Sequence, residues 1–203
     1  GEVGEVAMTA AVFGHGGPWT EEDYLALRND EIPERVELFD GSLHVTPAPT
    51  PYHQHMSGEL RAALRPAVRA AGLNVLEAVN VRLKSGRIPI PDLVITDDID
   101  FHELVIDGRA VRLVCEIISP SNASTDQVLK MHYYATAQIP WYLVVEPDTA
   151  TMCLYRLDGT HYVEHATAKP GQPLRLTDPV VAEIDPADLL PPGEPHSRWP
   201  TTP

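Results

Sequence analysis

Two carboxylates stand in apolar segments of the chain, where a charged side chain needs a partner. Asp92 follows Pro91 and opens the short run PDLVIT, and Glu116 lies inside the longer run VRLVCEIIS. Burying a carboxylate among apolar side chains is costly unless a cation or a hydrogen-bond donor compensates it. These two residues are therefore the first candidates for a site that performs chemistry.

The short apolar run PDLVIT and the longer run VRLVCEIIS are both predicted to be strands, and we expect them to pair antiparallel. In the register that sets Asp92 opposite Glu116, Thr96 lies opposite Arg112, and the alternate residues form one apolar face. Two carboxylates at that spacing repel each other, so one holds a proton or a cation lies between them. Oxygen ligands favour Mg²⁺ or Mn²⁺ over zinc.

Two further residues are candidates for the same site. Lys130 follows Asp126 by one helical turn on the helix expected after Glu116, and Glu37 lies on a predicted hairpin strand. Taken alone, the Asp126–Lys130 pair is typical of a solvated helix surface, and Glu37 is typical of a solvent-facing strand residue. Their assignment to the site depends on convergence in the fold.

Three residues are weaker candidates for contacts with the substrate. His53 opens a predicted helix and is expected to contact the substrate or to support the site from outside the ligand set; no third ligand at metal spacing supports zinc there. Gln127 and Ser119 could donate hydrogen bonds to a substrate, although serines at such positions more commonly start helices. No Gly-x-Ser-x-Gly motif and no glycine-rich phosphate loop occurs in the sequence.

The elements that must position these residues follow from periodicity and turn signals. We expect a short helix capped by Thr20, a hairpin turning at Asp40-Gly41, and a helix over 53–71 that contains Pro66. Strand-like segments follow over 74–85, 91–96 and 111–119, then a helix over 124–137 and strands over 141–147 and 151–166 with a turn at Asp158-Gly159. The fold class is α/β, or mixed α+β: a mixed central sheet flanked by helices, with hairpins near both ends.

Length and composition fit one globular domain. The 203 residues are expected to form a domain over 18–190, after an irregular or foreign segment at 1–17 and before a proline-rich tail at 191–203. No run resembles a membrane span or a signal peptide, and the two cysteines lie beside apolar residues, which predicts a cytoplasmic protein with reduced thiols.

The charge balance works against a polyanionic partner. Lys and Arg number 15 against 29 acidic residues, a formal net charge of −14. Such a chain repels nucleic acid unless metal ions or a local basic surface offset the charge. One segment is richer in basic residues than the rest and could supply that surface: Arg61, Arg65, Arg69, Arg82, Lys84 and Arg87.

Five segments together resemble the Uma-type family of restriction-endonuclease-like proteins, within the PD-(D/E)xK nuclease superfamily. They are VELFDGSLHVTPAPTPYHQH, PDLVI, VCEIISPS, the helix from Asp126 to Lys130, and QIPWYLVVEP. The resemblance implies a restriction-endonuclease-like core and a Mg²⁺-dependent nuclease site. It implies that Asp92 and Glu116 are metal ligands and that Glu37 is an additional acidic member.

One position departs from the superfamily motif. Ile118 stands two residues after Glu116, where the motif has lysine, and the resemblance assigns the lysine to the following helix, at Lys130. Lys130 would then position the attacking water or stabilise transition-state charge.

Three functions remain open at this stage. The first is a Mg²⁺- or Mn²⁺-dependent endonuclease acting on nucleic acid, with DNA favoured, as a homodimer without membrane association. The second is a catalytically inactive member of the same fold that acts as a binding or interaction module. The third is an acidic protein-binding domain in which Glu116 pairs with Arg112 or Lys130.

Overall fold

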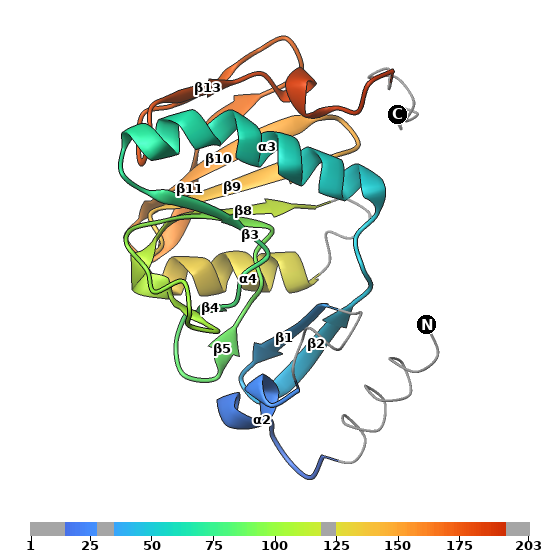
Figure 1. The fold of residues 1–203 in the computed structure, drawn as a ribbon, viewed down its shortest axis with the longest axis vertical. Coiled ribbons are helices and arrows are strands. Elements are labelled where there is room, and N and C mark those ends of the chain that lie inside the picture. Colours follow the sequence, from blue (N-terminus) through green and yellow to red (C-terminus); the bar gives the residue numbers. More distant parts are fainter. Residues whose placement is uncertain (1–14, 28–34, 119–124, 194–203) are drawn as a thin grey trace.

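Six strands pair into one mixed sheet in the order β11-β10-β9-β8-β6-β3 (Figure 1). This computed structural model describes residues 15–27, 35–118 and 125–193. Neighbouring strands are antiparallel except β8 and β9, whose parallel pairing requires a crossover, which α4 provides. The strands are β3 (Asn74–Glu77), β6 (Leu93–Thr96), β8 (Val111–Ile117), β9 (Trp141–Glu146), β10 (Thr151–Asp158) and β11 (His161–Ala168).

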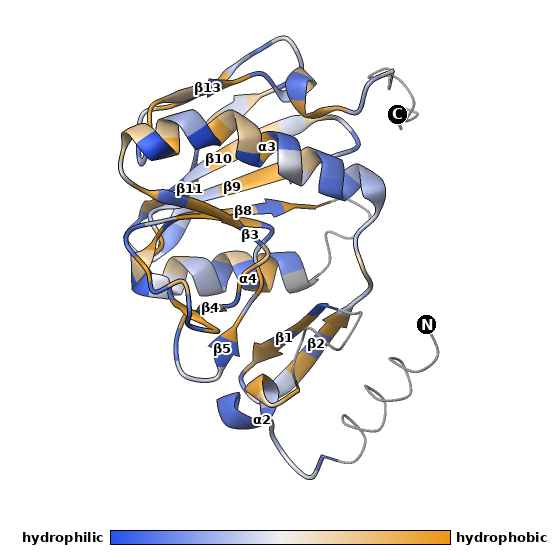
Figure 2. Cartoon of the chain, viewed as in Figure 1, coloured by the Kyte–Doolittle hydropathy of each residue, from blue (hydrophilic) through white to orange (hydrophobic). Residues whose placement is uncertain are grey.

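Helices α3 (Pro51–Ala70) and α4 (Thr125–Thr136) cover opposite faces of this sheet. Apolar residues of α3, such as Leu60 and Leu64, form one core cluster with Leu113 and its neighbours. Tyr134 of α4 belongs to a second cluster, with Val114. Figure 2 shows the contrast: β9 is mostly hydrophobic, whereas α3 carries hydrophobic and hydrophilic bands. Successive strand residues therefore face different cores, as the alternation of a strand demands.

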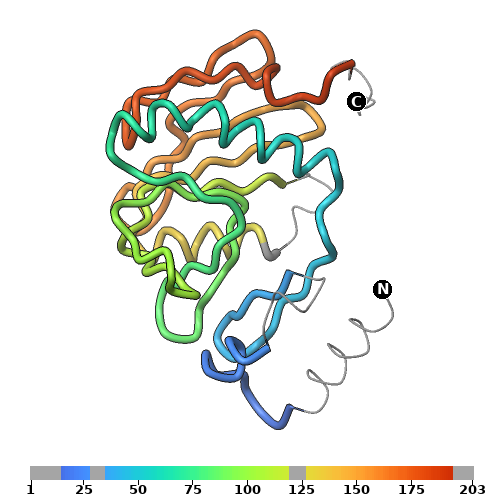
Figure 3. The backbone as a smooth tube through the Cα atoms, in the orientation of Figure 1, coloured from blue at the N-terminus to red at the C-terminus, as the bar shows by residue number. Residues whose placement is uncertain are grey.

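A second sheet, of order β2-β1-β5, brings the N-terminal hairpin beside the main sheet. It consists of β1 (Arg35–Phe39), β2 (Ser42–Thr46) and β5 (Arg87–Ile88), with α2 (Glu21–Leu25) packed nearby. The hairpin turns at Asp40 and Gly41, both with positive φ, as a two-residue turn favours. Figure 3 follows the chain from β2 directly into the start of α3.

Short elements complete the fold. Strand β4 (Val81–Arg82) pairs in parallel with β7 (Ile106–Asp107), and the 3₁₀ turn η2 (Gly108–Ala110) follows β7. The hairpin of β12 (Leu174–Leu176) and β13 (Ala182–Ile184), followed by η4 (Pro186–Leu189), contributes apolar residues to the α3 core. No helix in the described ranges combines the length and the apolar character needed to span a membrane.

Most of the predicted elements are confirmed, including the mixed sheet flanked by helices. Thr20 caps α2, α3 runs through Pro66 to Ala70, and β10 and β11 form the later hairpin. The terminal segments expected at 1–17 and 191–203 lie mostly outside the described residues. The hairpin of β12 and β13 was not predicted.

The strands expected over 74–85 are confirmed as β3 and β4, which lie in different sheets because the chain turns at Ala78, whose φ is +51°. One prediction of strand register is wrong. Thr96 lies opposite Val111 rather than Arg112, because the ladder shifts between Ile95 and Thr96.

Candidate active site

Three carboxylates converge where the two sheets meet. Glu37 comes from β1, Asp92 immediately precedes β6, and Glu116 lies in β8; their exposed fractions are 2%, 4% and 4%. The pairing of Leu93 with Cys115 carries Asp92 and Glu116 to the same end of the β6–β8 ladder. Strand β5 pairs with β1, and the amide of Ile90 just beyond β5 donates to Glu37 Oε1 at 2.8 Å. The convergence predicted for these residues is therefore present.

Asp92 is held as an anion by donors on three sides. Its Oδ1 accepts from Arg35 Nη1 at 2.8 Å and lies 3.3 Å from His53 Nε2, and its Oδ2 accepts from the Ile117 amide at 2.7 Å. Burial by itself would raise the pKa of Asp92, but the hydrogen bond and charge of His53, together with Arg35, lower it to about 2. Asp92 is thus charged at any physiological pH.

His53 reaches Asp92 because it lies in the first turn of α3. The Thr50 hydroxyl accepts from the His53 amide at 3.2 Å and caps the helix there. Burial opposes protonation of His53, yet the hydrogen bond and charge of Asp92 raise its pKa above the usual value. The raised pKa favours the protonated form of His53, whose positive charge lies beside Asp92.

Lys130 lies between the other two carboxylates. Its Nζ is 2.9 Å from both oxygens of Glu37 and 3.8 Å from Glu116 Oε1. Burial opposes the charge, but Glu116 and Glu37 raise the pKa of Lys130 well above its usual value. Neither Glu37 nor Lys130 lies on a solvated surface, the alternative that each suggests when taken alone: Glu37 is buried, and Lys130 reaches Glu37 and Glu116 because α4 packs its inner face against the sheet.

Glu116 is the carboxylate whose protonation is most finely balanced. The Tyr134 hydroxyl donates to Glu116 Oε1 at 2.5 Å. Burial, supported by the negative charges of Asp92 and Glu37 and opposed by Lys130 and Tyr134, raises the pKa of Glu116 to about 7. Near neutral pH this carboxyl group can hold a proton or release it to a cation.

The donor chemistry of this group fits a hard divalent cation. All three acidic side chains offer oxygen, which Mg²⁺ and Mn²⁺ prefer. As the side chains stand, no three acidic, imidazole or thiol groups in the described ranges lie close enough together to share a metal ion. Asp92 and Glu116 could hold such an ion together, because they lie at the same end of the β6–β8 ladder and Lys130 is closer to Glu37 than to Glu116.

The remaining predicted residues contribute less. Gln127 lies half-buried on α4, while Ser119 and the side chain of Asp126 lie outside the described residues. Ile118 donates its backbone N–H to the Val145 carbonyl at 2.9 Å and places an apolar side chain where the motif has lysine. Arg112 pairs with Asp97 at 2.9 Å, so it does not neutralise Glu116.

Sequence reasoning missed two residues of the site, Arg35 and Tyr134. Arg35 lies two residues before Glu37 on β1 and so shares its face, and Tyr134 lies one helical turn beyond Lys130 on α4. Both spacings were available as signals. The ring of Tyr134 is fully buried, so this residue also belongs to the core.

The fold of the chain is similar to that of a solved crystal structure. The chain superposes on a crystal structure described as that of "a putative nuclease belonging to DUF820 from Anabaena variabilis ATCC 29413", with a TM-score of 0.66 and 16% identity. The match covers 85% of this chain and 97% of that one. At this identity the likeness establishes the fold alone.

The family is established by the sequence. The family model "Uma2: Putative restriction endonuclease" matches residues 21–187, and the chain belongs to this family. No curated protein matches the chain. The matched range includes Glu37, Asp92, Glu116 and Lys130.

Proposed function

We propose that the chain is a metal-dependent endonuclease that hydrolyses phosphodiester bonds of nucleic acid, with DNA as the favoured substrate. Asp92 and Glu116 would hold Mg²⁺ or Mn²⁺, and Glu37 would complete or orient that ligand set. The observation that carries the proposal is the buried group of three carboxylates with Lys130 among them, in a chain of the restriction endonuclease family.

Each residue has a role that follows from its surroundings. Asp92, kept anionic by Arg35 and the Ile117 amide, is an oxygen ligand at every working pH. Glu116 supplies a second ligand once its proton leaves, near pH 7. When bound, a divalent cation makes water nucleophilic near neutral pH and offsets charge on the phosphorus.

Lys130 would act on the phosphate itself. Its ammonium stays protonated, and Glu37 fixes its position from 2.9 Å. A fixed positive charge in a water-poor site stabilises the charge that develops on the phosphoryl oxygens, without reorganisation during the reaction. His53 would keep Asp92 oriented through the contact between Nε2 and Oδ1.

One observation favours a second function, that of a non-catalytic binding module. The carboxylates already have cationic partners within the chain, with Arg35 on Asp92 and Lys130 between Glu37 and Glu116. A fold that needs no metal to balance these charges could serve binding alone. The absence of lysine at Ile118 points the same way.

The test is nicking of supercoiled plasmid with added Mg²⁺ or Mn²⁺. Wild-type protein should nick the plasmid, and chelation should stop it. Asp92→Asn and Glu116→Gln should each lose at least about 100-fold in rate, since metal catalysis supplies several kcal/mol of the barrier reduction. The matched control is Asp97→Asn, which breaks a surface pair with Arg112 just beyond β6 and should keep wild-type activity.

Two results would contradict the proposal that the chain is an endonuclease. One is wild-type rates in both site variants. The other is a folded wild-type protein that binds nucleic acid without cutting it in either metal, which would support the binding module.

A further inference from the structure

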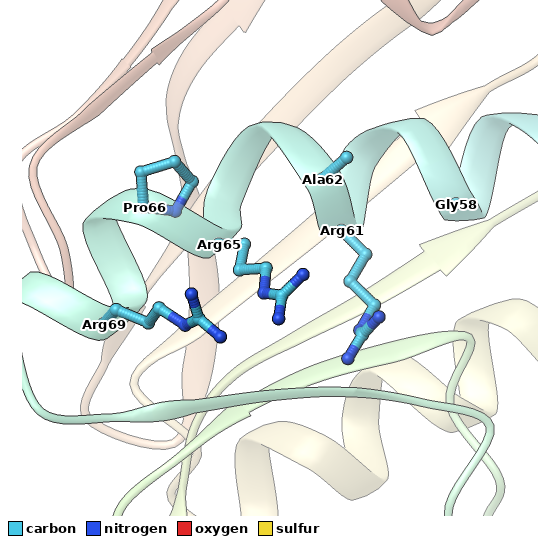
Figure 4. Close-up of a pocket in the computed structure, with 6 residues that line it drawn as sticks. All are labelled: Gly58, Arg61, Ala62, Arg65, Pro66 and Arg69. Carbon is cyan, nitrogen blue, oxygen red and sulfur yellow. The ribbon is translucent and has the colours of Figure 1, made fainter.

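The outer face of α3 carries a line of arginines along the helix. Arg61, Arg65 and Arg69, here the arginine row, follow one another at intervals of four residues, so they lie about 6 Å apart along the axis. Figure 4 shows all three side chains leaving the helix on the same side. The row borders the apolar face that packs on the sheet: Arg65 and Arg69 are exposed, and Arg61 is half-buried.

A second line, of small residues, runs beside the arginine row. Gly58, Ala62 and Pro66 have the same spacing, and together with the arginines they line an open hollow of about 360 Å³ (Figure 4). Small side chains let a ligand approach the helix surface closely, while the guanidinium groups stand along one side. The hollow is thus open to solvent and has guanidinium groups along one side.

The arginine row is the part of the basic segment left without acidic partners. Arg82 pairs with Glu21, and Lys84 and Arg87 both pair with Asp40. The members of the arginine row form no ion pair with any carboxylate in the described ranges. Arg61 Nε makes only a 3.5 Å contact with the Val75 carbonyl. In a chain of net charge −14, three such arginines in line mark a place for an anion.

The arginine row lies on α3, the helix whose first turn carries His53 to the candidate active site. His53, beside Asp92, precedes Arg61 by eight residues and Arg69 by sixteen, which correspond to about 12 Å and about 24 Å along the axis. An extended polyanion that enters the site can therefore reach the row.

We propose that the arginine row binds the sugar–phosphate backbone of the nucleic acid on which the site acts. This inference rests on the proposed function. Guanidinium groups match phosphate oxygens in a two-pronged geometry, and evenly spaced arginines suit an evenly spaced line of phosphates. The contacts are with the backbone, so they position the substrate without reading its sequence.

The test is the salt dependence of binding, measured by fluorescence anisotropy on a labelled DNA duplex of about 30 base pairs in chelator, where cutting does not occur. The variant Arg61→Gln/Arg65→Gln/Arg69→Gln removes the arginine row, and glutamine keeps the helix propensity. The matched control, Arg156→Gln/Lys169→Gln/Arg175→Gln, changes the net charge equally, at residues outside α3.

Wild-type protein and the control should show the same slope of log affinity against log salt. Losing three phosphate contacts should flatten that slope by about 2.7 in the row variant. Between about 50 and 200 mM salt, wild-type affinity should then fall about 40-fold further than that of the variant. Equal slopes in all three proteins, or no binding by the wild type, would overturn the proposal.

A small substrate separates this inference from the proposed function. Bis(p-nitrophenyl) phosphate cannot span from the site to the arginine row, so the row variant should hydrolyse it at the wild-type rate. If the wild type cuts this substrate and the row variant keeps the wild-type salt slope, the arginine row proposal fails and the nuclease stands. If the slope changes as expected and nothing is cut, the arginine row stands and the nuclease fails.

Sedimentation of both proteins tests an acidic protein surface as the alternative occupant. If the wild type self-associates, the row variant does not, and their DNA slopes agree, the row binds a second copy and the proposal is overturned.

Discussion

At the scale of single residues, Lys130 balances the negative charge of Glu37 and Glu116. It lies 2.9 Å from Glu37 and 3.8 Å from Glu116, and both carboxylates are almost fully buried. Removing one partner of a buried ion pair leaves an uncompensated charge, which costs more than the intact pair contributes. The same ammonium is thus expected to support both folding and catalysis.

Lys130→Met should lower the free energy of unfolding by about 3 kcal/mol, because Glu37 is left buried without its cation. Urea denaturation measures the change. Adding Glu37→Gln should restore part of the loss, since the unpaired charge is then gone. Additive losses in the double variant would show that the two residues are not coupled.

Glu116 should make stability depend on pH. Its pKa is raised from 4.5 to about 7 in the folded protein, so between these values the unfolded chain loses a proton that the folded chain keeps. The contribution of Glu116 to stability is therefore full below about pH 4.5 and falls as the pH rises to about 7.

Glu116→Gln removes this titration while keeping an acceptor for Tyr134. The variant should melt at a higher temperature than the wild type at about pH 8 and at nearly the same temperature at about pH 5. Thermal denaturation at both pH values measures this, with the exposed Glu183→Gln as control. A difference that does not change with pH would contradict the raised pKa.

The sequence predicted the three carboxylates and Lys130, because apolar neighbours and the family motif marked them. It did not predict that Lys130 bonds Glu37, or that Arg35 neutralises Asp92. Those contacts join residues 93 and 57 positions apart. These contacts form because β1 packs against the main sheet, and a local sequence pattern carries no information about that packing.

At the scale of elements, the start of α3 sets the position of His53. The Thr50 side chain accepts from the His53 amide, and Pro51 opens the helix at a position where its missing N–H costs nothing. A fixed first turn keeps the imidazole within reach of Asp92.

Thr50→Ala should lower the free energy of unfolding by about 1 kcal/mol, because the amide loses its acceptor. Thr50→Ser keeps the hydroxyl and should stay close to the wild type. Chemical denaturation of the three proteins measures both changes. Equal stability of the alanine and serine variants would mean that this cap contributes nothing.

Elements marked by a run or a regular pattern of apolar residues could be predicted from the sequence, and very short ones without such a mark could not. Strands β6 and β8 are short, nearly continuous apolar runs, and the register that sets Asp92 opposite Glu116 also pairs Val94 with Val114, as the structure has it. Strand β5, which ties β1 to the chain before Asp92, has only two residues and carries no period of its own. The turn at Ala78 was missed because a non-glycine residue with positive φ is uncommon.

At the scale of the whole molecule, the acidity of the chain is distributed unevenly. Part of the negative charge is gathered at Glu37, Asp92 and Glu116, where the proposed metal would offset it, and the outer face of α3 carries the arginine row. The net charge of −14 therefore limits where nucleic acid can bind without excluding it.

Cutting both strands of a duplex usually involves two sites, and a symmetric pair is the commonest assembly that supplies them. We therefore expect a homodimer, with a mass twice the 22.3 kDa of one chain, in sedimentation equilibrium. A single species of one chain across the concentration range would contradict this expectation.

The central claim, that Asp92 and Glu116 hold a divalent metal, is tested most directly by crystals soaked in Mn²⁺. Data collected at a wavelength where manganese scatters anomalously should show one strong peak between the two carboxylates. Absence of the peak at saturating Mn²⁺, with Lys130 still bridging Glu37 and Glu116 as it does here, would contradict the account.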